Sequence, residues 1–196
     1  MDRIYIAGFD EVPKRLTLRE EEELRLSFVI LPGLSADLPF EIDISKSGVN
    51  LEIYCVYICP HSERVHFNFT VRHLVGGSRS RQVFRGVVGG TARAEFDGLI
   101  YVAPGAQKTK AFQDSRTVLL SEGAFAESRP QLEIYADDVE CSHGATSGFL
   151  NQDELFYLRS RGIPEAEARR MQMLSFVAPA IAHLPEDVKA RILERL

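Results

Sequence analysis

The sequence predicts a mainly β chain that ends in a small α-helical region. Short runs alternate apolar and polar residues with the period of two typical of half-buried strands, and glycine-rich or polar turns separate them. A helical pattern starts only near residue 151. We therefore expect a β domain over 1–150 and a helical region over 151–196. Strands with no helix between them are typical of a sandwich, a barrel or a solenoid.

The strand runs are clearest in the middle of the chain. Residues of one parity are apolar in two successive runs, namely Leu51, Ile53, Cys55 and Tyr57, then Val65, Phe67, Phe69 and Val71. A third run covers 131–136, and turns are expected at 76–78, 89–91 and 97–98. The acidic run from Glu20 to Glu23 is interpreted as a solvated surface, either a helical turn or a charged edge strand, and not as a metal site.

A short internal repeat bears on the choice among these β folds. The pentapeptide that starts at Phe84, FRGVV, recurs twelve residues later as FDGLI, starting at Phe96. Stacked coils of a β-solenoid would produce a repeat of this kind. Chance similarity in a chain rich in glycine and phenylalanine explains two copies equally well.

Start and stop signals divide the carboxyl-terminal region into three helices. Asn151 followed by Glu154 resembles a capping box, and Gly162 is a natural stop. Pro164 and Pro185 stand where the second and third helices should begin, and Pro179 should end or kink the second. Apolar stripes follow at helical spacing, comprising Ala168, Met171, Leu174 and Val177, then Val188, Ile192 and Leu196.

Composition narrows the class of protein. Apolar residues make up 45% of the 196 residues, which is typical of a globular chain. A net charge of −5 argues against a nucleic-acid partner, because phosphate binding needs a basic surface. We expect no membrane segment, since no apolar run approaches about 20 residues. Three cysteines and no apolar leader indicate a reducing, cytoplasmic location.

The densest chemistry lies around Cys141 and His143. Asp137 and Asp138 precede them, so a thiol, an imidazole and two carboxylates fall within seven residues of what is expected to be a turn. Such groups suit a transition metal or a nucleophile–base pair. An exposed turn with an ordinary cysteine explains the same residues. One cysteine and one histidine do not fill a tetrahedral site, so no metal is expected in the isolated chain.

Two longer stretches carry a family resemblance. PQLEIYADDVECSHGAT, continuing to LFYLRSRGI, closely resembles the carboxyl-terminal signature of the SufD branch of the SufB/SufD family of iron–sulfur cluster assembly scaffolds. FRGVVGGTARAEFDGLIYVAPGAQKTKAFQDSRTVLLSEGAFAESRP resembles the last coils of the same proteins. The resemblance is collinear over about 62–183, and residues 1–50 match poorly.

The resemblance implies a fold and a set of partners. The fold is a right-handed parallel β-helix with a small helical region, working beside a SufB-like scaffold and a SufC-like ABC-type ATPase. A transient iron–sulfur cluster would form at the scaffold interface, with His143 as the ligand from this chain and Cys141 as a weaker candidate. The ATPase would dock on 151–182, where Phe156, Arg159 and Arg161 are the expected contacts. No catalytic residue is implied, and the chain is expected not to be an enzyme.

Two differences favour SufD over SufB. SufB proteins have a cysteine in the coil where this chain reads Leu119-Leu120-Ser121, and a glutamate directly after the histidine, where this chain has Gly144. The chain is also much shorter at its amino end than typical members of the family. Because Leu119-Leu120-Ser121 contains no cysteine, the chain lacks the main thiolate ligand proposed for the family. We therefore do not expect it to assemble a cluster alone.

Alternatives remain open on the sequence. A homodimer through the same β-helix edges would need no cluster, and a thiol-dependent protein would use Cys141 with His143. Cys55, Cys59, His61 and His66 have a spacing that suggests zinc, but both cysteines share the parity of core residues, so we expect core packing instead. His73, at the end of a strand, is expected to be exposed.

Overall fold

The computed structural model describes residues 1–8, 10–20 and 22–196, and its main body is built from parallel strands. The strands are β1 (Asp2–Ile6), β2 (Arg15–Leu18), β3 (Glu23–Ile30), β4 (Ala36–Ile44), β5 (Asn50–Cys59), β6 (Arg64–His73), β7 (Arg79–Val88), β8 (Arg93–Val102), β9 (Thr109–Leu119), β10 (Phe125–Ile134) and β11 (Val139–Phe149). Three helices follow, α1 (Gln152–Ser160), α2 (Glu165–Ile181) and α3 (Glu186–Leu193).

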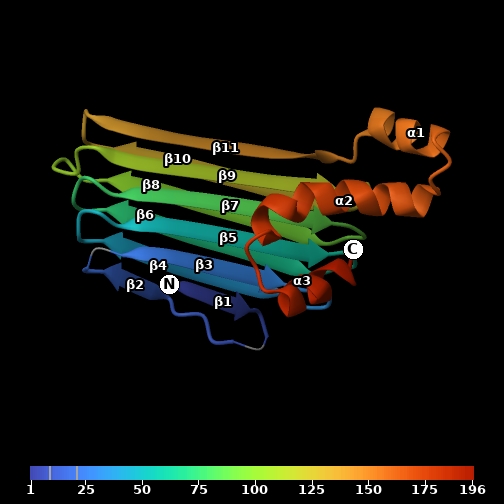
Figure 1. The fold of residues 1–196 in the computed structure, drawn as a ribbon, viewed down its shortest axis with the longest axis horizontal. Coiled ribbons are helices and arrows are strands. Elements are labelled where there is room, and N and C mark those ends of the chain that lie inside the picture. Colours follow the sequence, from blue (N-terminus) through green and yellow to red (C-terminus); the bar gives the residue numbers. More distant parts are fainter. Residues whose placement is uncertain (9, 21) are drawn as a thin grey trace.

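The strands alternate between two facing sheets. Odd-numbered strands form one sheet in the order β1-β3-β5-β7-β9-β11, and even-numbered strands form the other in the order β10-β8-β6-β4-β2. The paired strands are parallel, and each strand hydrogen-bonds to the strand one full coil away. The result is a β-solenoid of about five turns, whose successive coils lie one above the other in Figure 1. This confirms the fold predicted from the sequence.

The interior of the solenoid is filled by the alternating residues. Leu51, Ile53, Cys55 and Tyr57 point inward and are almost fully buried, as the parity predicts. Phenylalanine rings contact one another from coil to coil and across the interior. Phe40 and Phe69 are register partners on β4 and β6 with centroids 5.5 Å apart, and Phe28 of the facing sheet meets Phe69 edge-on at 5.1 Å. Neighbouring coils of a solenoid can bury a continuous core only when each supplies apolar residues at the same positions.

The twelve-residue repeat is not the coil repeat. Phe84 lies on β7 and Phe96 on β8, so the two rings face each other from opposite sheets, with centroids 4.4 Å apart. The residue stacked on Phe84 one coil later is Ser115, on β9. On the inner face of each of these two strands, the Phe-x-Gly repeat instead places a phenylalanine ring next to a glycine that has no side chain. The interpretation of the repeat as stacked coils was therefore wrong, although the fold was right.

Helices α2 and α3 cover the outer face of the six-stranded sheet (Figure 1). Val177 and Ile181 of α2 pack with outward residues of the sheet such as Val56 and Val83, and the hydrophobic cluster continues into α3. Strands β5 and β7 are therefore buried on both faces and alternate less than β6 and β8, whose outer face is polar. Pro179 was expected to end or kink the second helix; it lies inside α2, which continues for two more residues to Ile181, so it does not end the helix.

The start of α1 follows its sequence signal. The Asn151 side chain accepts hydrogen bonds from the backbone N–H groups of Asp153 and Glu154, at 2.9 and 3.2 Å. Gly162 has a φ of +85°, which ends this first helical segment in the left-handed conformation that glycine favours. Figure 1 shows α1 projecting beyond the ends of the strands.

Strands β1 to β4, within the first 50 residues, form the first coils of the solenoid. Strands β1 to β4 pair in register with the strands above them, so this segment continues the same architecture despite its weak resemblance to the family. The acidic run at 20–23 includes residue 21, which lies outside the described residues, and Glu23 opens β3. In the described part of the chain, each helix is too short or too polar to cross a bilayer.

Candidate functional site

The last coil of the solenoid carries the candidate site. Cys141 and His143 lie within strand β11, not in a turn as the sequence suggested, and pair in register with Ala111 and Gln113 of β9. Because side chains alternate along a strand, both point to the same side as the buried side chain of Gln113, toward the inside of the solenoid. The inside is open here, since no further coil follows.

The absence of a following coil explains why the inner row of β11 is exposed. His143 is exposed, and so are the next inward residues, Ala145, Ser147 and Phe149. Phe149 leaves 60% of its surface to solvent. The residues that pair with these positions one coil earlier, on β9, lie in the interior of the solenoid. The end of the solenoid is therefore a surface made of interior positions.

The two ends of the solenoid differ in their edges. At the amino-terminal end the edge strands β1 and β2 are short, with 5 and 4 residues. At the carboxyl-terminal end β10 and β11 have 10 and 11 residues, and each has a strand neighbour on one side within its sheet. Long edge strands are templates for pairing with another chain, and short ones are not.

Cys141 is the more enclosed of the two candidate ligands. Its side chain packs against a small interior cluster that includes Ile100 and Ala111. Burial raises the pKa of its thiol, and a hydrogen bond from the backbone of Ala111 opposes the shift without cancelling it. The neutral thiol is therefore favoured, which argues against the low-pKa nucleophile that a thiol-dependent protein would need.

The two aspartates do not join this pair. Asp137 and Asp138 lie in the connection before β11, where the backbone N–H of Asp138 donates to Oε1 of Gln107 at 2.8 Å. In residues 1–8, 10–20 and 22–196, no three His, Cys, Asp or Glu side chains are grouped so as to hold a metal ion. Cys141 and His143 would need ligands from a second chain to bind one.

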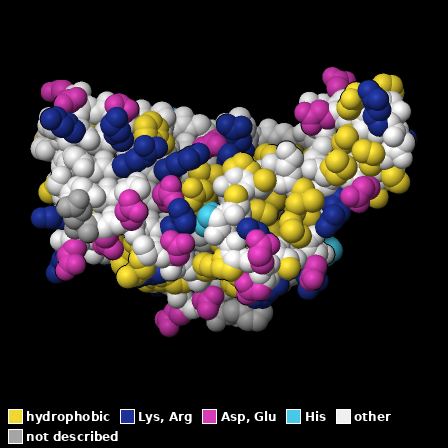
Figure 2. Space-filling model, in the orientation of Figure 1, with side chains coloured by type: hydrophobic (Ala, Val, Ile, Leu, Met, Phe, Trp, Pro, Cys, Tyr) yellow, Lys and Arg dark blue, Asp and Glu magenta, His cyan; other side chains and the backbone are white. Residues whose placement is uncertain are grey.

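The predicted docking residues Phe156 and Arg159 lie on helix α1, and Arg161 directly follows it. Phe156 is 74% exposed and Tyr157 57% exposed, while Leu155 is buried. The Arg161 guanidinium lies 5.3 Å from the centre of the Tyr157 ring, and Arg159 pairs with Glu165 at 3.3 Å. Figure 2 shows hydrophobic side chains gathered over the helical end of the molecule, including its projecting tip.

The sequence did not single out Gln172, which anchors α1. Its side chain lies on α2 and is buried, and Nε2 donates to the backbone oxygen of Asn151 at 2.9 Å and to Oε2 of Glu154 at 3.1 Å. A groove lined by Phe149, Gln172 and Phe176 lies between the end of β11 and the helices. The signal in the sequence was weak, because one glutamine in a helix is ordinary.

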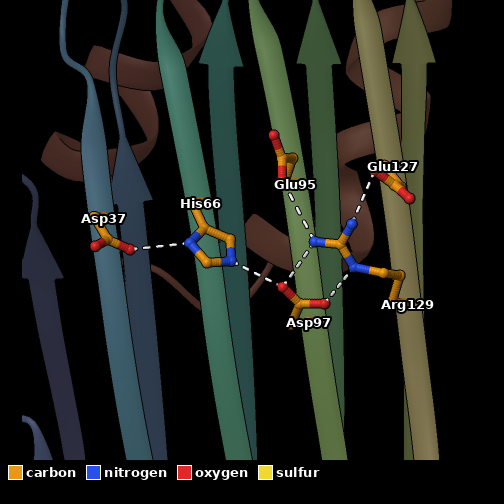
Figure 3. Close-up of polar contacts among 6 residues, drawn as sticks. All are labelled: Asp37, His66, Glu95, Asp97, Glu127 and Arg129. Atoms are coloured by element: carbon orange, nitrogen blue, oxygen red, sulfur yellow. Dashed lines mark hydrogen bonds and ion pairs between the residues drawn. The ribbon is translucent and has the colours of Figure 1, made fainter.

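The four residues with zinc-like spacing are not brought together. Cys55 and Cys59 are buried inside the solenoid, as the parity predicted. His66 points outward from β6 and takes part in a charged ladder across the five-stranded sheet (Figure 3). Its Nδ1 lies 3.1 Å from Asp37 of β4 and its Nε2 lies 2.9 Å from Asp97 of β8.

The ladder of Figure 3 continues to the last coil. Arg129, on β10, donates from Nε to Asp97 at 2.6 Å and also pairs with Glu95 and Glu127. Hydrogen bonding to Arg129 and then to His66 lowers the pKa of Asp97 to about 2. The same carboxylate raises the pKa of His66, more than burial lowers it. We interpret this ladder as a tie between coils rather than as a binding site.

His73 was predicted to be exposed and is buried. It ends β6 on the inward parity of Phe67, Phe69 and Val71, and its Nε2 lies 2.8 Å from the hydroxyl oxygen of Ser80. Burial lowers its pKa to about 4, so the ring is neutral at physiological pH. His183 lies just after α2, where Nε2 is 2.7 Å from the Ser27 hydroxyl.

Sequence comparison finds relatives of this chain among iron–sulfur cluster assembly proteins. The chain is 42% identical over 127 residues to the iron–sulfur cluster assembly protein SufD of Escherichia coli (strain K12), covering 64% of this chain. It is 38% identical over 129 residues to SufD of Bacillus subtilis (strain 168), again over 64% of this chain. A SufBD family protein of Mycobacterium tuberculosis (strain H37Rv), Rv1462, is 29% identical over 178 residues, or 86% of this chain.

These relatives are longer proteins. The matched region spans 30% of each of the two SufD proteins and 45% of the mycobacterial protein. A family model described as the SufBD core domain of SUF system FeS cluster assembly matches residues 14–176, which include β2 to β11, α1 and most of α2. The chain therefore belongs to the SufBD core family, and its similarity to the two SufD proteins makes it SufD-like.

Proposed function

We propose that this chain is a non-catalytic scaffold subunit in iron–sulfur cluster assembly, where it pairs with a SufB-like scaffold through its last coil. The observation that carries the proposal is the open end of the solenoid. Two long edge strands and an exposed row of interior positions lie there together. Membership of the SufBD core family supports the same role. We further propose that the chain works in the cytoplasm.

The cluster is cargo at this interface rather than a resident cofactor. His143 begins the exposed inner row of β11, two residues from Cys141, and neutral imidazole is a good ligand for iron. The chain offers one accessible ligand, so the remaining ligands would come from the SufB-like partner. A site divided between two chains assembles and opens with the interface, which suits a cluster that must be handed on.

The SufC-like ABC-type ATPase would dock on the projecting helix α1. An exposed Phe156 beside Arg159 and Arg161 gives an apolar anchor with cationic neighbours, the combination enriched at protein interfaces. Gln172 and the Asn151 cap hold α1 against α2, and α2 packs on the sheet. A movement of the ATPase would therefore be transmitted to the sheet whose last strand carries His143.

The experiment is an anaerobic co-purification of this chain with the SufB-like and SufC-like proteins of its own organism. Wild type, His143→Ala and the control Ser142→Ala are compared for complex yield, iron and acid-labile sulfide. Ser142 is the neighbour of His143 on β11 and points to the other face of the strand, so it controls for disturbance of the edge. We expect His143→Ala to keep the complex and lose the cluster, and Ser142→Ala to keep both.

Two results would contradict the proposal. Equal iron and sulfide in the His143→Ala complex would remove the histidine from the site. Failure of wild type to bind either partner, with sedimentation showing a dimer of this chain, would favour the homodimer. That alternative rests on the same long edges of β10 and β11, and a Gly148→Pro substitution in β11 should weaken either form of pairing through this edge.

A further inference from the structure

A cavity of about 510 Å³ lies where strands β5, β7 and β9 begin, at residues that include Gly48, Gly77, Arg79, Lys108 and Lys110. The hydrophobic cluster under α2 and α3 involves later residues of these strands, so the cavity lies beside the area that the helices cover. Figure 2 shows Lys and Arg side chains gathered on the part of this face that lies away from the helices. The cavity is therefore open to a ligand and bordered by cations.

The turns before these three strands share one backbone conformation. Gly48, Gly77 and Lys108 each stand two residues before a set of register partners, namely Asn50, Arg79 and Lys110. Their φ angles are +81°, +71° and +59°. The backbone N–H of Gly48 donates to the oxygen of Gly77 at 3.1 Å, and that of Gly77 donates to the oxygen of Gln107 at 2.9 Å. The stacking of the coils thus imposes the left-handed conformation at this position, whichever residue fills it.

Lys108 fills a position that suits glycine better. In residues 1–8, 10–20 and 22–196, it is the one residue other than glycine with a positive φ. A side chain makes this conformation unfavourable, and the two preceding coils avoid the cost with glycine. The Lys108 side chain is exposed, so core packing does not explain why the lysine is there. Strained residues are concentrated at functional sites, and the property that this one adds is a positive charge.

Two of the charges that line the cavity are neutralised by neighbours. Nζ of Lys110 lies 2.7 Å from Oε1 of Glu140 on β11. Glu52 is the carboxylate among the described lining residues, and its Oε2 lies 2.9 Å from Nε of Arg25. Neither Lys110 nor Glu52 therefore leaves a net charge at the cavity.

Arg79 and Lys108 keep their positive charges unpaired. Neither has a carboxylate within ion-pair distance in the part of the chain that the structure describes. The Arg79 guanidinium instead lies 5.6 Å from the centre of the Phe112 ring, a contact that leaves its charge in place. The cavity thus presents two uncompensated positive charges on a chain whose net charge is −5.

We infer that this cavity binds a phosphate group carried on a small molecule, with Arg79 and Lys108 meeting its charge. A phosphate ester carries about −1.5 to −2 charges at pH 7, which matches two unpaired cations, whereas a carboxylate brings one. Arginine and lysine both bind phosphate oxygens, the first as a fork of donors and the second as a point charge. The cavity is larger than a phosphate group alone, so it has room for the rest of an ester. It lies on the outer face of the sheet, opposite the inner row of His143, and is independent of the proposed function.

The test uses the isolated chain, labelled with 15N and titrated at pH 7.5 and constant ionic strength. The probes are glycerol 3-phosphate, inorganic phosphate and, as a carboxylate of one charge, acetate. The amide signals of Gly48 and Gly77 report on the cavity. Wild type is compared with Lys108→Gly, with Arg79→Gln and with the control Lys14→Gly, which removes an exposed lysine before β2 of the other sheet.

We expect glycerol 3-phosphate to give saturable shifts in wild type and in Lys14→Gly. Lys108→Gly and Arg79→Gln should each bind it about 5-fold more weakly, as is typical for loss of one partly exposed ion pair. Because glycine accepts the left-handed conformation, Lys108→Gly should unfold at a urea concentration no lower than wild type. Weaker binding with undiminished stability would show that the lysine serves a ligand rather than the fold.

Three results would overturn the inference. They are no saturable shift with either phosphate, equal affinity in wild type and both cavity variants, and acetate binding as tightly as glycerol 3-phosphate. Tighter binding of inorganic phosphate than of the ester would support the site and identify the free ion as its ligand. Should Lys108→Gly prove unstable, Arg79→Gln decides the question alone.

Discussion

The hydroxyl of Tyr57 lies 2.6 Å from the hydroxyl oxygen of Thr117, although β7 separates the two strands that carry them. The residue between them in the register column is Gly86. The tyrosine ring crosses the space that a side chain at position 86 would occupy. One side chain therefore links three successive strands of the six-stranded sheet, and the link depends on the glycine of the first Phe-x-Gly copy.

Gly86→Ala should destabilise the protein by about 3 kcal/mol, because the added methyl overlaps a fully buried ring. Tyr57→Phe, which removes only the hydroxyl, should cost about 1 kcal/mol. Combining Tyr57→Leu with Gly86→Ala should recover part of the stability that Gly86→Ala loses, because leucine is smaller than tyrosine and leaves space for the added methyl group. Wild type, Gly86→Ala, Tyr57→Leu and the double variant form a double-mutant cycle, measured by urea unfolding. Strict additivity would show that the ring and position 86 do not interact.

The His66 ladder predicts a pH-dependent contribution to stability. The folded pKa of His66 is raised above its ordinary value of 6.5, first by its hydrogen bond to Asp97. The stabilisation is therefore fully present below pH 6.5 and is lost as the pH rises through the folded pKa. The difference in urea midpoint between wild type and His66→Asn should be larger at pH 5.5 than at pH 8.5. A difference that grows with pH would contradict this sign, and in an Asp97→Asn background the trend should weaken.

Cysteine reactivity separates the scaffold from a thiol-dependent protein. Burial raises the pKa of Cys141, so at pH 7.5 it should react with iodoacetamide more slowly than a free thiol such as glutathione. Cys55 and Cys59 are buried in the core, and burial raises the pKa of both, so they should react only after unfolding. Mass spectrometry of peptides over time measures all three. Fast labelling of Cys141 would favour the thiol-dependent alternative.

Docking of the ATPase on α1 predicts a large effect from one exposed side chain. Phe156→Ala should weaken binding of the SufC-like protein by 10-fold or more, about the loss expected at an interface hot spot. It should leave the unfolding free energy within about 0.5 kcal/mol, because the ring is exposed. Leu74→Ala is the control, an exposed apolar residue in the connection after β6, away from the helices. Equal loss of binding in both variants would argue against α1 as the docking site.

The solenoid core was predictable because a buried inner face imposes strict alternation. The parity that placed Cys55 and Cys59 inside also places His73 inside, since His73 continues the row of Phe67, Phe69 and Val71. The expectation of exposure gave the polar ring more weight than its position. A buried imidazole needs a hydrogen-bond partner, and the hydroxyl of Ser80, seven residues later, is that partner for His73.

The site was harder to predict than the core. Ser142 to Gly144 has the composition of a turn, but the register with β9 keeps it in a strand. No local pattern in the sequence shows that the inner row of β11 is exposed, because the exposure comes from the lack of a coil above it. Stacking also makes neighbours of residues about 30 apart in sequence, such as Gln113 and His143, and no local pattern shows this.

The stacking of parallel strands has a consequence for cooperativity. Each strand bonds only to the strands one coil away, so the solenoid behaves as a nearly one-dimensional array in which unzipping starts from an end. Helices α2 and α3 clamp the outer face of β5 and β7, but β10 and β11 have a neighbour on one side within their sheets. A partner that adds a strand there would close the fraying end. Its binding energy would then appear as slower hydrogen exchange several coils away, in strands that it never touches.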